Sequence, residues 1–186
     1  MADNDMWTIK AALDWTIGFL ERKGDENPRL SAEWLMSEAT GLSRIELYMN
    51  FERPLTLDER ATLRDFVARR GKGEPLQLIS GKVPFRYITV LVAPNVLIPR
   101  PETEVLVSEA FAELKLPRDA DHVAASENGE EVVSPELPEL RVVDLCTGSG
   151  CIACSIASEY PAAHVVALDI APEALALAGK NVEVLG

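Results

Sequence analysis

Apolar side chains recur at helical spacing through the first 70 residues of the chain. The first stripe of such residues consists of Met6, Ile9, Leu13, Ile17 and Leu20. A second helix begins near Leu30 and ends at Gly41, because glycine is a common residue just past a helix end. Capping boxes at 43–46 and 56–59 mark the starts of two further helices. The pattern predicts a small bundle of short amphipathic helices.

The pattern changes at Gly71 and Pro75, which interrupt helical periodicity. The β-branched and aromatic run 85–92 predicts a strand, and residues 76–79 would form either its hairpin partner or an extended linker. The run 99–104 then predicts the start of another helix, because proline and acidic residues both suit a first helical turn.

The C-terminal part of the chain alternates between strand and helix patterns. Apolar runs at 142–145 and 165–169 predict two buried strands, and the helix between them carries Ile152 and Ile156 on one face. Pro172 begins a last helix that continues almost to the final residue. A strand, a helix and a parallel strand open a doubly wound sheet, so we expect an α/β fold.

Residues 117–139 interrupt this order with three prolines, many acidic residues and little periodicity. Such composition predicts an acidic, mobile surface loop that acts as a spacer. The expected domains are therefore a helical domain at 1–72, a hairpin or linker at 73–98, and the first part of an α/β domain at 99–186.

Composition and charge narrow the classes of function. Apolar residues make up 47% of the chain and charged residues 26%, as in ordinary globular proteins. The formal net charge of -12 disfavours non-specific binding to nucleic acid. No run is long and apolar enough to span a membrane, and the N-terminus lacks the basic and apolar regions of a signal peptide. We therefore expect a cytoplasmic protein.

The three cysteines, Cys146, Cys151 and Cys154, lie in one short stretch. Their odd number and clustering argue against a disulfide scaffold. They offer at most three thiolates without an adjacent histidine, which is too few for a closed zinc site. We expect Cys151 and Cys154 to pack as small buried residues and predict no metal site.

A candidate nucleotide pocket lies in the pattern Asp144-x-x-Thr147-Gly148-Ser149-Gly150, which is followed by Asp169. Glycines in a loop after a strand allow a tight turn and close approach of a ligand. That loop follows the carboxyl end of a strand, where open α/β sheets bind ligands. An acidic residue at the end of the next strand can accept hydrogen bonds from both ribose hydroxyls of an adenosine. The separation of Gly148 and Asp169 fits the spacing of about 20 residues that this geometry needs.

Two cofactors compete for this pocket. The spacing Gly148-x-Gly150-x-x-Ala153 also fits the dinucleotide fingerprint, which would indicate NAD. Asp144, however, precedes the glycines at the end of the first strand, in the manner of motif I of class I methyltransferases. A carboxylate there would repel a pyrophosphate but suit a ligand with a cationic sulfonium. The pattern therefore favours S-adenosylmethionine over NAD.

The chain resembles the PrmC/HemK family of methyltransferases that modify peptide-chain release factors. The resemblance rests on Gly81, Phe85, the runs 96–104 and 143–150, and, in the helical part, the runs 42–48 and 74–77. It covers nearly the whole chain except 117–139. The run Pro99-Arg100-Pro101-Glu102-Thr103-Glu104 is its most specific part, because motif I alone indicates only a methyltransferase.

The resemblance implies a function. Members of this family use S-adenosylmethionine to methylate the side-chain amide nitrogen of the glutamine in the Gly-Gly-Gln motif of release factors. They join a helical N-terminal domain, which contacts the release factor, through a β-hairpin to a seven-stranded, Rossmann-like methyltransferase domain. The release factor is then the expected protein partner, with no direct nucleic-acid partner and no membrane association.

The resemblance also assigns site residues. The expected cofactor-binding residues are Asp144, Cys146, Thr147, Gly148, Ser149, Gly150 and Asp169. The residues expected to line the active site are Phe85, Pro99, Arg100, Pro101, Glu102 and Thr103. Cys146 stands where the family usually has glycine, which predicts a backbone conformation that a non-glycine residue can hold.

The sequence departs from the family in one motif. An Asn-Pro-Pro-Tyr motif holds the glutamine amide in the family, and it does not occur in these 186 residues. Only the first two strands of a seven-stranded domain can be recognised. We therefore expect a fragment without catalytic residues of its own, inactive alone and at most a weak cofactor binder.

Three other functions remain open from the residues alone. The helical domain could make the chain a non-catalytic binding module for release factors. Another class I methyltransferase would share motif I, and an NAD-dependent enzyme would share the glycine spacing.

Overall fold

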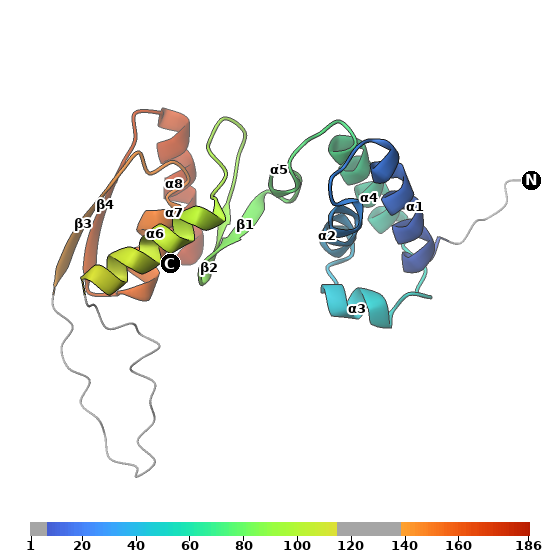
Figure 1. Cartoon of the computed structure of the whole chain (residues 1–186), viewed down its shortest axis with the longest axis horizontal. Helices are drawn as coiled ribbons and strands as arrows, with labels where there is room; N and C mark the ends of the chain where they lie inside the picture. The colour runs from blue at the N-terminus through green and yellow to red at the C-terminus, as the bar shows by residue number, and fades with distance from the viewer. Residues whose placement is uncertain (1–6, 115–138) are drawn as a thin grey trace, which may run out of the picture. The chain divides into compact units, whose positions relative to one another are not determined.

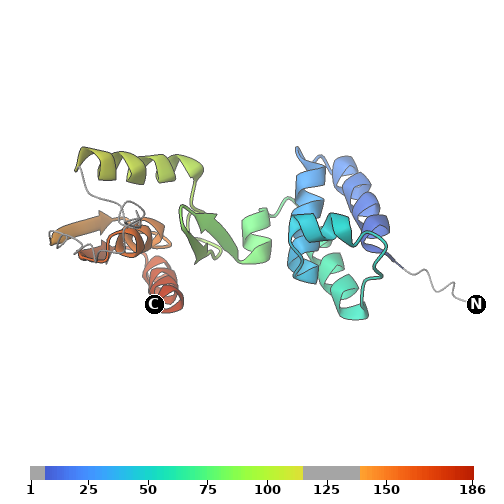
Figure 2. The same ribbon diagram turned by 90° about the horizontal axis from the view of Figure 1, so that it is seen from below.

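The computed structural model describes residues 7–114 and 139–186. These residues form two compact units, which divide between Ser80 and Gly81. The described part of the first unit is helical, and the second contains two small sheets and their helices (Figure 1, Figure 2). Within the described ranges, no helix is both long and apolar enough to cross a membrane. The predicted acidic loop lies, apart from Glu139, outside the described residues.

The helices of the first unit begin and end largely where the sequence predicts them. They are α1 (Ile9–Arg22), α2 (Pro28–Thr40), α3 (Arg44–Met49), α4 (Leu57–Arg70) and α5 (Leu76–Ser80). Ser43 and Thr56 each form the predicted capping box, with Glu46 and Glu59 respectively. Gly41 ends α2 with a left-handed φ of 71°.

The prediction of a strand or extended linker at 76–79 is wrong, because this segment is helix α5. The amides of Leu78 and Ile79 both donate to the carbonyl of Pro75, which begins a helical turn. The Arg69 guanidinium donates to the Leu78 carbonyl at 3.1 Å, and Ile79 is buried against the helical core. Tertiary contacts therefore place α5 with the first unit.

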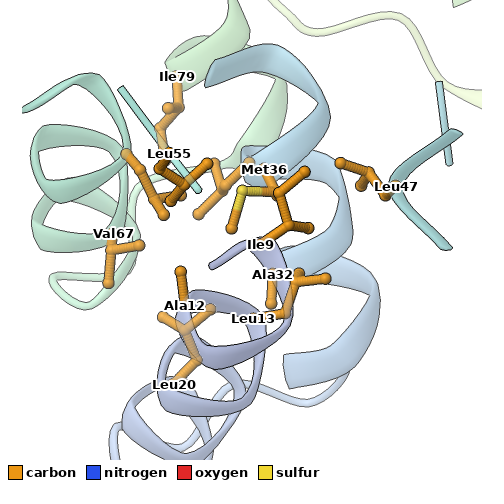
Figure 3. Packing of buried hydrophobic residues seen from close by; sticks show 12 residues of the cluster. Ile9, Ala12, Leu13, Leu20, Ala32, Met36, Leu47, Leu55, Val67 and Ile79 are labelled. Carbon is orange, nitrogen blue, oxygen red and sulfur yellow. The ribbon is translucent and has the colours of Figure 1, made fainter. Parts of the chain in front are cut away.

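The first unit has its own hydrophobic core. Figure 3 shows side chains from α1, α2 and α4 pointing toward one another, with Leu55 and Ile79 beside them. Its completely buried members are Ile9, Leu20, Ala32, Leu35, Met36 and Leu47. Burial of each large aliphatic side chain stabilises the fold by roughly 1.5–3 kcal/mol before the entropic cost of folding is subtracted. The unit therefore buries enough apolar surface to form one core.

Glu33 is a buried charge that joins α2 to α3. Its side chain is 4% exposed and accepts hydrogen bonds from the Arg29 guanidinium, at 3.0 Å, and from the Tyr48 hydroxyl. The Nε of Arg44 lies 2.7 Å from its second carboxylate oxygen. Burial alone would raise the pKa of Glu33, but the hydrogen bonds from Tyr48 and Arg29 and the charge of Arg44 outweigh it and lower the pKa. Glu33 is therefore ionised when the unit is folded.

We expect Glu33→Gln to lower the free energy of unfolding of the first unit by about 1.5–3 kcal/mol near neutral pH, because two arginines lose a charged partner. Since the folded pKa is lowered, the contribution of Glu33 is complete above the ordinary glutamate pKa of about 4.3. It is lost as the pH falls through the folded pKa. Urea denaturation at several pH values measures this, followed by the fluorescence of tryptophans, all of which lie in this unit.

The exposed residue Glu21 on α1 provides the control, since Glu21→Gln removes a charge without a buried partner. A stability difference between Glu33→Gln and the wild type that stays constant down to pH 3 would contradict the assigned role of this carboxylate.

The second unit begins with a hairpin. β1 (Lys82–Phe85) pairs antiparallel with β2 (Ile88–Leu91), and Phe85 lies opposite Ile88. Arg86 and Tyr87 therefore form a two-residue turn, in which Arg86 has a left-handed φ of 51°. The prediction of one strand across 85–92 is wrong, because the chain reverses direction inside that run.

The α/β part has the predicted order of elements. It consists of α6 (Pro101–Glu113), β3 (Leu140–Leu145), α7 (Cys151–Glu159), β4 (Ala163–Leu168) and α8 (Pro172–Leu185). β3 and β4 pair in parallel, with Asp144 opposite Ala167 and Leu145 opposite Leu168 (Figure 1). The predicted unit of strand, helix and parallel strand is thus confirmed.

The apolar runs predicted that the two parallel strands would be buried on both faces, but the structure leaves one face exposed. Side chains alternate between the faces of a sheet, and one row stays exposed here. This row contains Val143, Leu145, Val166 and Leu168, which are 48–69% exposed. The other row contains Asp144, which is 7% exposed, and lies on the side where α7 contacts β4. Periodicity could not reveal this, because a run that is apolar throughout does not say which face is covered.

Arg86 links the hairpin turn to two helices. Its guanidinium forms a two-pronged ion pair with Glu159 at the end of α7, with both N–O distances at 2.5 Å. It also donates to the carbonyl of Glu104 at 3.0 Å and to the hydroxyl of Ser108, both on α6. The side chains of Arg86 and Glu159 are only 5% and 7% exposed. The carboxylate of Glu159 raises the pKa of Arg86 and keeps it charged.

We expect Arg86→Met to lower the free energy of unfolding by about 3–5 kcal/mol, because Glu159 would remain as a buried charge without this cation. The double variant R86M/E159Q should recover part of this loss. The exposed pair of Lys10 and Asp14 gives a control, since Asp14→Asn should cost less than about 1 kcal/mol. Chemical denaturation followed by circular dichroism measures all three, and equal losses for R86M and D14N would refute the assignment.

Candidate functional site

The predicted pocket residues converge at the carboxyl ends of β3 and β4. The Gly-rich loop, residues 146–150, connects β3 to α7, and Asp169 follows β4 directly. Carboxyl ends of parallel strands lie at the same edge of a sheet, so the two segments meet. The amide of Thr147 donates to the carbonyl of Leu168 at 2.9 Å, which joins the loop to the end of the second strand.

The Gly-rich loop contains left-handed residues at alternate positions. The φ angles are 62° at Cys146, 57° at Gly148 and 79° at Gly150. A Cβ atom on Gly150 would lie 3.0 Å from the Cβ of Ala178 on α8, so both its backbone angle and its surroundings require glycine. Around Gly148 there is more room, because a Cβ would meet only Val96, at 3.9 Å.

The structure shows which backbone conformation Cys146 holds. The residue was expected to adopt a conformation that a non-glycine residue can hold, and its φ of 62° lies in the small left-handed region that is open to such residues. Such a conformation costs an L-residue roughly 1–2 kcal/mol. The structure therefore explains why glycine is favourable here, and Cys146 occupies the position with backbone strain.

Asp144 and Asp169 hold the loop from two sides. The Thr147 hydroxyl donates to Asp144 at 2.6 Å. The Gly148 amide donates to one carboxylate oxygen of Asp169 at 2.8 Å, and the Ala171 amide donates to the other at 3.0 Å. The hydrogen bonds from Ala171 and Gly148 lower the pKa of Asp169. Asp169 is therefore an anion at neutral pH with lone pairs left to accept further hydrogen bonds.

Several loop amides are already hydrogen bonded within the protein. The amide of Thr147 donates to Leu168, that of Gly148 to Asp169, and that of Gly150 to the Thr147 carbonyl at 2.9 Å. These groups are not free to surround a phosphate, as the loop amides of a dinucleotide site do. The loop instead presents a backbone with internally hydrogen-bonded amides beside the carboxylate of Asp169.

Ser149 and the cysteines differ in their access to solvent. Ser149 is 2% exposed and lies on the inner side of the loop, whereas Cys146 is exposed. Cys151 and Cys154 are buried in α7, where burial raises the pKa of both thiols. They stay protonated and pack as small apolar groups. Among residues 7–114 and 139–186, no group of three or more potential metal ligands is found.

The residues expected to line the active site lie in two environments. Phe85 is 1% exposed and packs inside the second unit at the end of β1. Arg100 is the N-cap of α6, and Pro101 and Glu102 begin its first turn; all three are exposed, while Pro99 and Thr103 are partly buried. The Thr103 amide donates to the Arg100 carbonyl at 3.0 Å.

Sequence reasoning missed two residues beside the loop. Val96 lies next to Gly148, and Asn181 on α8 is fully buried and donates to the Ser149 carbonyl at 2.8 Å. One signal for Asn181 was available in the sequence. It is an asparagine on the face of the last helix that otherwise carries apolar residues. Its partners are far away in the sequence, so the pattern alone did not identify it.

Comparison with known proteins gives a consistent result along the chain. Residues 11–81 match a family described as the PrmC N-terminal domain, and residues 126–186 match the methyltransferase small domain. A release factor glutamine methyltransferase of Geobacter sulfurreducens is 46% identical over 179 residues, which are 96% of this chain and 55% of that protein.

Proteins of the same name in other bacteria are also similar. The one from Rhodopirellula baltica is 41% identical over 177 residues, which are 95% of this chain and 54% of that protein. The one from Escherichia coli is 35% identical over 161 residues, which are 87% of this chain and 50% of that protein. The chain thus spans about half the length of the curated relatives that it matches. Over 87–96% of its length the chain is therefore similar to proteins named release factor glutamine methyltransferase, and its two matched segments are a PrmC N-terminal domain and a methyltransferase small domain.

Proposed function

We propose that the protein uses S-adenosylmethionine to methylate the side-chain amide of the glutamine in the Gly-Gly-Gln motif of peptide-chain release factors. The similarity to proteins named release factor glutamine methyltransferase supports the reaction class, and the geometry of the Gly-rich loop supports the cofactor. The observation that carries the proposal is the pair of carboxylates, Asp144 and Asp169, which flank a loop whose amides are largely satisfied within the protein.

The residues present fit S-adenosylmethionine better than a dinucleotide. This cofactor carries a sulfonium and an ammonium group, and two carboxylates beside the loop favour positive charge. A pyrophosphate would meet the same carboxylates as repulsive neighbours and would find the amides of Thr147, Gly148 and Gly150 already engaged. The same loop that matches the dinucleotide spacing is therefore better suited to a cationic ligand.

Each loop residue has a proposed role. Asp169 would accept hydrogen bonds from the ribose hydroxyls through its remaining lone pairs. The Gly148 and Ala171 amides, which donate to its carboxylate, keep it in place. Gly148 offers backbone with open space around it, where a ligand can approach closely. Asp144 orients the loop through the Thr147 hydroxyl. Cys146, Ser149 and Gly150 complete the turn of residues 146–150.

The proposed methyl transfer depends mainly on how the two reactants are positioned. When bound, the cofactor would supply a methyl group activated by its sulfonium charge. The glutamine amide is a weak nucleophile, so alignment of its nitrogen with that methyl group must supply much of the rate enhancement. We propose that Pro99, Arg100, Pro101, Glu102 and Thr103 form part of the substrate side, with Phe85 supporting them from the hairpin. None of these residues is proposed to act as acid or base.

The remaining features of the proposal follow from the family. The helical unit, which extends to Ser80, would recognise the release factor, and the hairpin of β1 and β2 would link it to the catalytic domain. Residues from 99 would open a seven-stranded Rossmann-like domain. The small helical bundle expected from the sequence is part of the same proposal. We propose that this activity takes place in the cytoplasm.

Calorimetric titration of the 186-residue chain tests the cofactor. We expect binding of S-adenosylmethionine and no measurable binding of NAD, because the carboxylates favour a cationic ligand. Binding of NAD at equal or higher affinity would overturn the proposal for the pocket.

Asp169→Asn should weaken binding of S-adenosylmethionine by about 10–100-fold, since a neutral amide replaces a charged acceptor of the ribose hydroxyls. The same titration measures this change. Glu109→Gln on α6 removes an exposed carboxylate elsewhere in the unit and should leave the affinity within about twofold. Equal affinities for D169N and the wild type would exclude the ribose contact.

Arg100→Ala tests the substrate side in the whole protein. We expect kcat/KM for methylation of a purified release factor to fall about tenfold or more, with the affinity for the cofactor unchanged. Mass spectrometry of the Gly-Gly-Gln peptide measures the methyl group gained. Arg141→Ala is the matched control, because Arg141 is an exposed arginine of the same unit whose side chain is 85% accessible. If R100A and R141A methylate equally well, Arg100 has no part in the site.

A further inference from the structure

Asn181 is a polar residue in the interior of the second unit. It lies on α8, and its side chain is completely buried. The adjacent turn of the same helix face presents Leu177 and Ala178, which are 6% exposed each. α8 contacts both β2 and α7, so the asparagine side chain reaches the space between the hairpin and the Gly-rich loop. A buried amide is costly unless all its polar atoms find partners.

The partners of Asn181 belong to two segments that are distant in the sequence. Its Oδ1 accepts from the Leu91 amide at 2.6 Å, and its Nδ2 donates to the Leu91 carbonyl at 3.1 Å. The same Nδ2 donates to the Ser149 carbonyl at 2.8 Å. On the edge of β2 that faces away from β1, the backbone of Leu91 is thus hydrogen bonded to the Asn181 side chain. The same side chain donates to the Gly-rich loop at Ser149.

The chemistry of this contact requires an amide. Leu91 offers one donor and one acceptor, and Ser149 offers one acceptor. The asparagine side chain supplies one acceptor oxygen and two N–H donors, which match this set one to one. An ionised aspartate would place a charge against two carbonyl oxygens, and a leucine of similar size would leave all three backbone groups without their partner.

The chain that follows Leu91 also reaches the loop. Val96 lies beside Gly148, where its Cγ1 would be 3.9 Å from an added Cβ, and Ala178 lies beside Gly150. Successive loop residues therefore each have a different neighbour outside the loop: Val96 for Gly148, Asn181 for Ser149 and Ala178 for Gly150. The segment between β2 and α6 and the Gly-rich loop are held together as one surface.

We propose that Asn181 is a positioning residue of the cofactor site, which fixes the Gly-rich loop against the segment that leads from β2 to the Pro99–Thr103 run. This inference rests on the proposed function for the identity of the ligand. Asn181 does not touch the cofactor. It sets the position of the Ser149 backbone and, through Leu91, the position of the chain that passes over Gly148.

The test compares Asn181→Asp and Asn181→Leu with Val90→Ala in the 186-residue chain. Val90 is fully buried in β2 but lies outside the loop, so V90A loosens the hairpin without removing the amide. We expect both Asn181 variants to weaken binding of S-adenosylmethionine by about tenfold or more. V90A should change it by less than about threefold at a comparable loss of thermal stability. If the Asn181 variants and V90A weaken binding equally at equal stability, Asn181 is only part of the core and the proposal is overturned.

Hydrogen exchange separates failure of this proposal from failure of the proposed function. The Gly148 and Gly150 amides, both hydrogen bonded in the loop, should exchange faster in N181L than in V90A even without ligand. Absence of cofactor binding by the wild-type chain would count against the proposed cofactor site in this part of the protein but leave this readout intact. Unchanged exchange of both loop amides in N181L would overturn the positioning role whatever the chain binds.

Discussion

The second unit depends on holding a loop of alternating left-handed residues in one conformation. With left-handed backbone at Cys146, Gly148 and Gly150, the polar groups of the loop cannot pair as they would in a regular helix or strand. Their partners therefore come from other elements: the end of β4 for Thr147, Asp169 for Gly148, and Asn181 on α8 for Ser149. Because these partners lie at the end of β4 and on α8, the loop conformation and the positions of these two elements depend on one another.

A second constraint is that each buried charged side chain needs polar partners. Glu33 in the first unit and Arg86 in the second are each surrounded by several polar partners, which is the condition under which a charged side chain can be buried. Arg86 connects the hairpin turn to α6 and α7, so it also fixes where α6 begins relative to the hairpin. The two ends of the segment that passes the Gly-rich loop, at Leu91 and at the start of α6, are therefore both anchored by buried polar side chains.

Local signals and distant contacts explain which expectations held. The capping boxes at Ser43 and Thr56 gave correct helix starts, because a cap involves residues within one turn. The run 76–79 carries no such local signal, because its helix is supported by Arg69 and by burial of Ile79 in a core that the local pattern does not show. The hairpin turn at Arg86 was missed for a similar reason: no glycine or asparagine marks it, and its left-handed backbone is supported by contacts with Glu159 and α6.

The sequence by itself determined the order of helices and strands in the α/β part, the position of the Gly-rich loop and the placement of Asp169 at the same edge of the sheet. These depend on periodicity, on glycine spacing and on the rule that parallel strands present their carboxyl ends at one edge. Only the tertiary structure decided that Cys146 is left-handed, that one row of the strands is exposed, and that Asn181 joins Leu91 to Ser149. Those features arise from contacts between residues that are far apart along the chain, and no local pattern encodes such contacts.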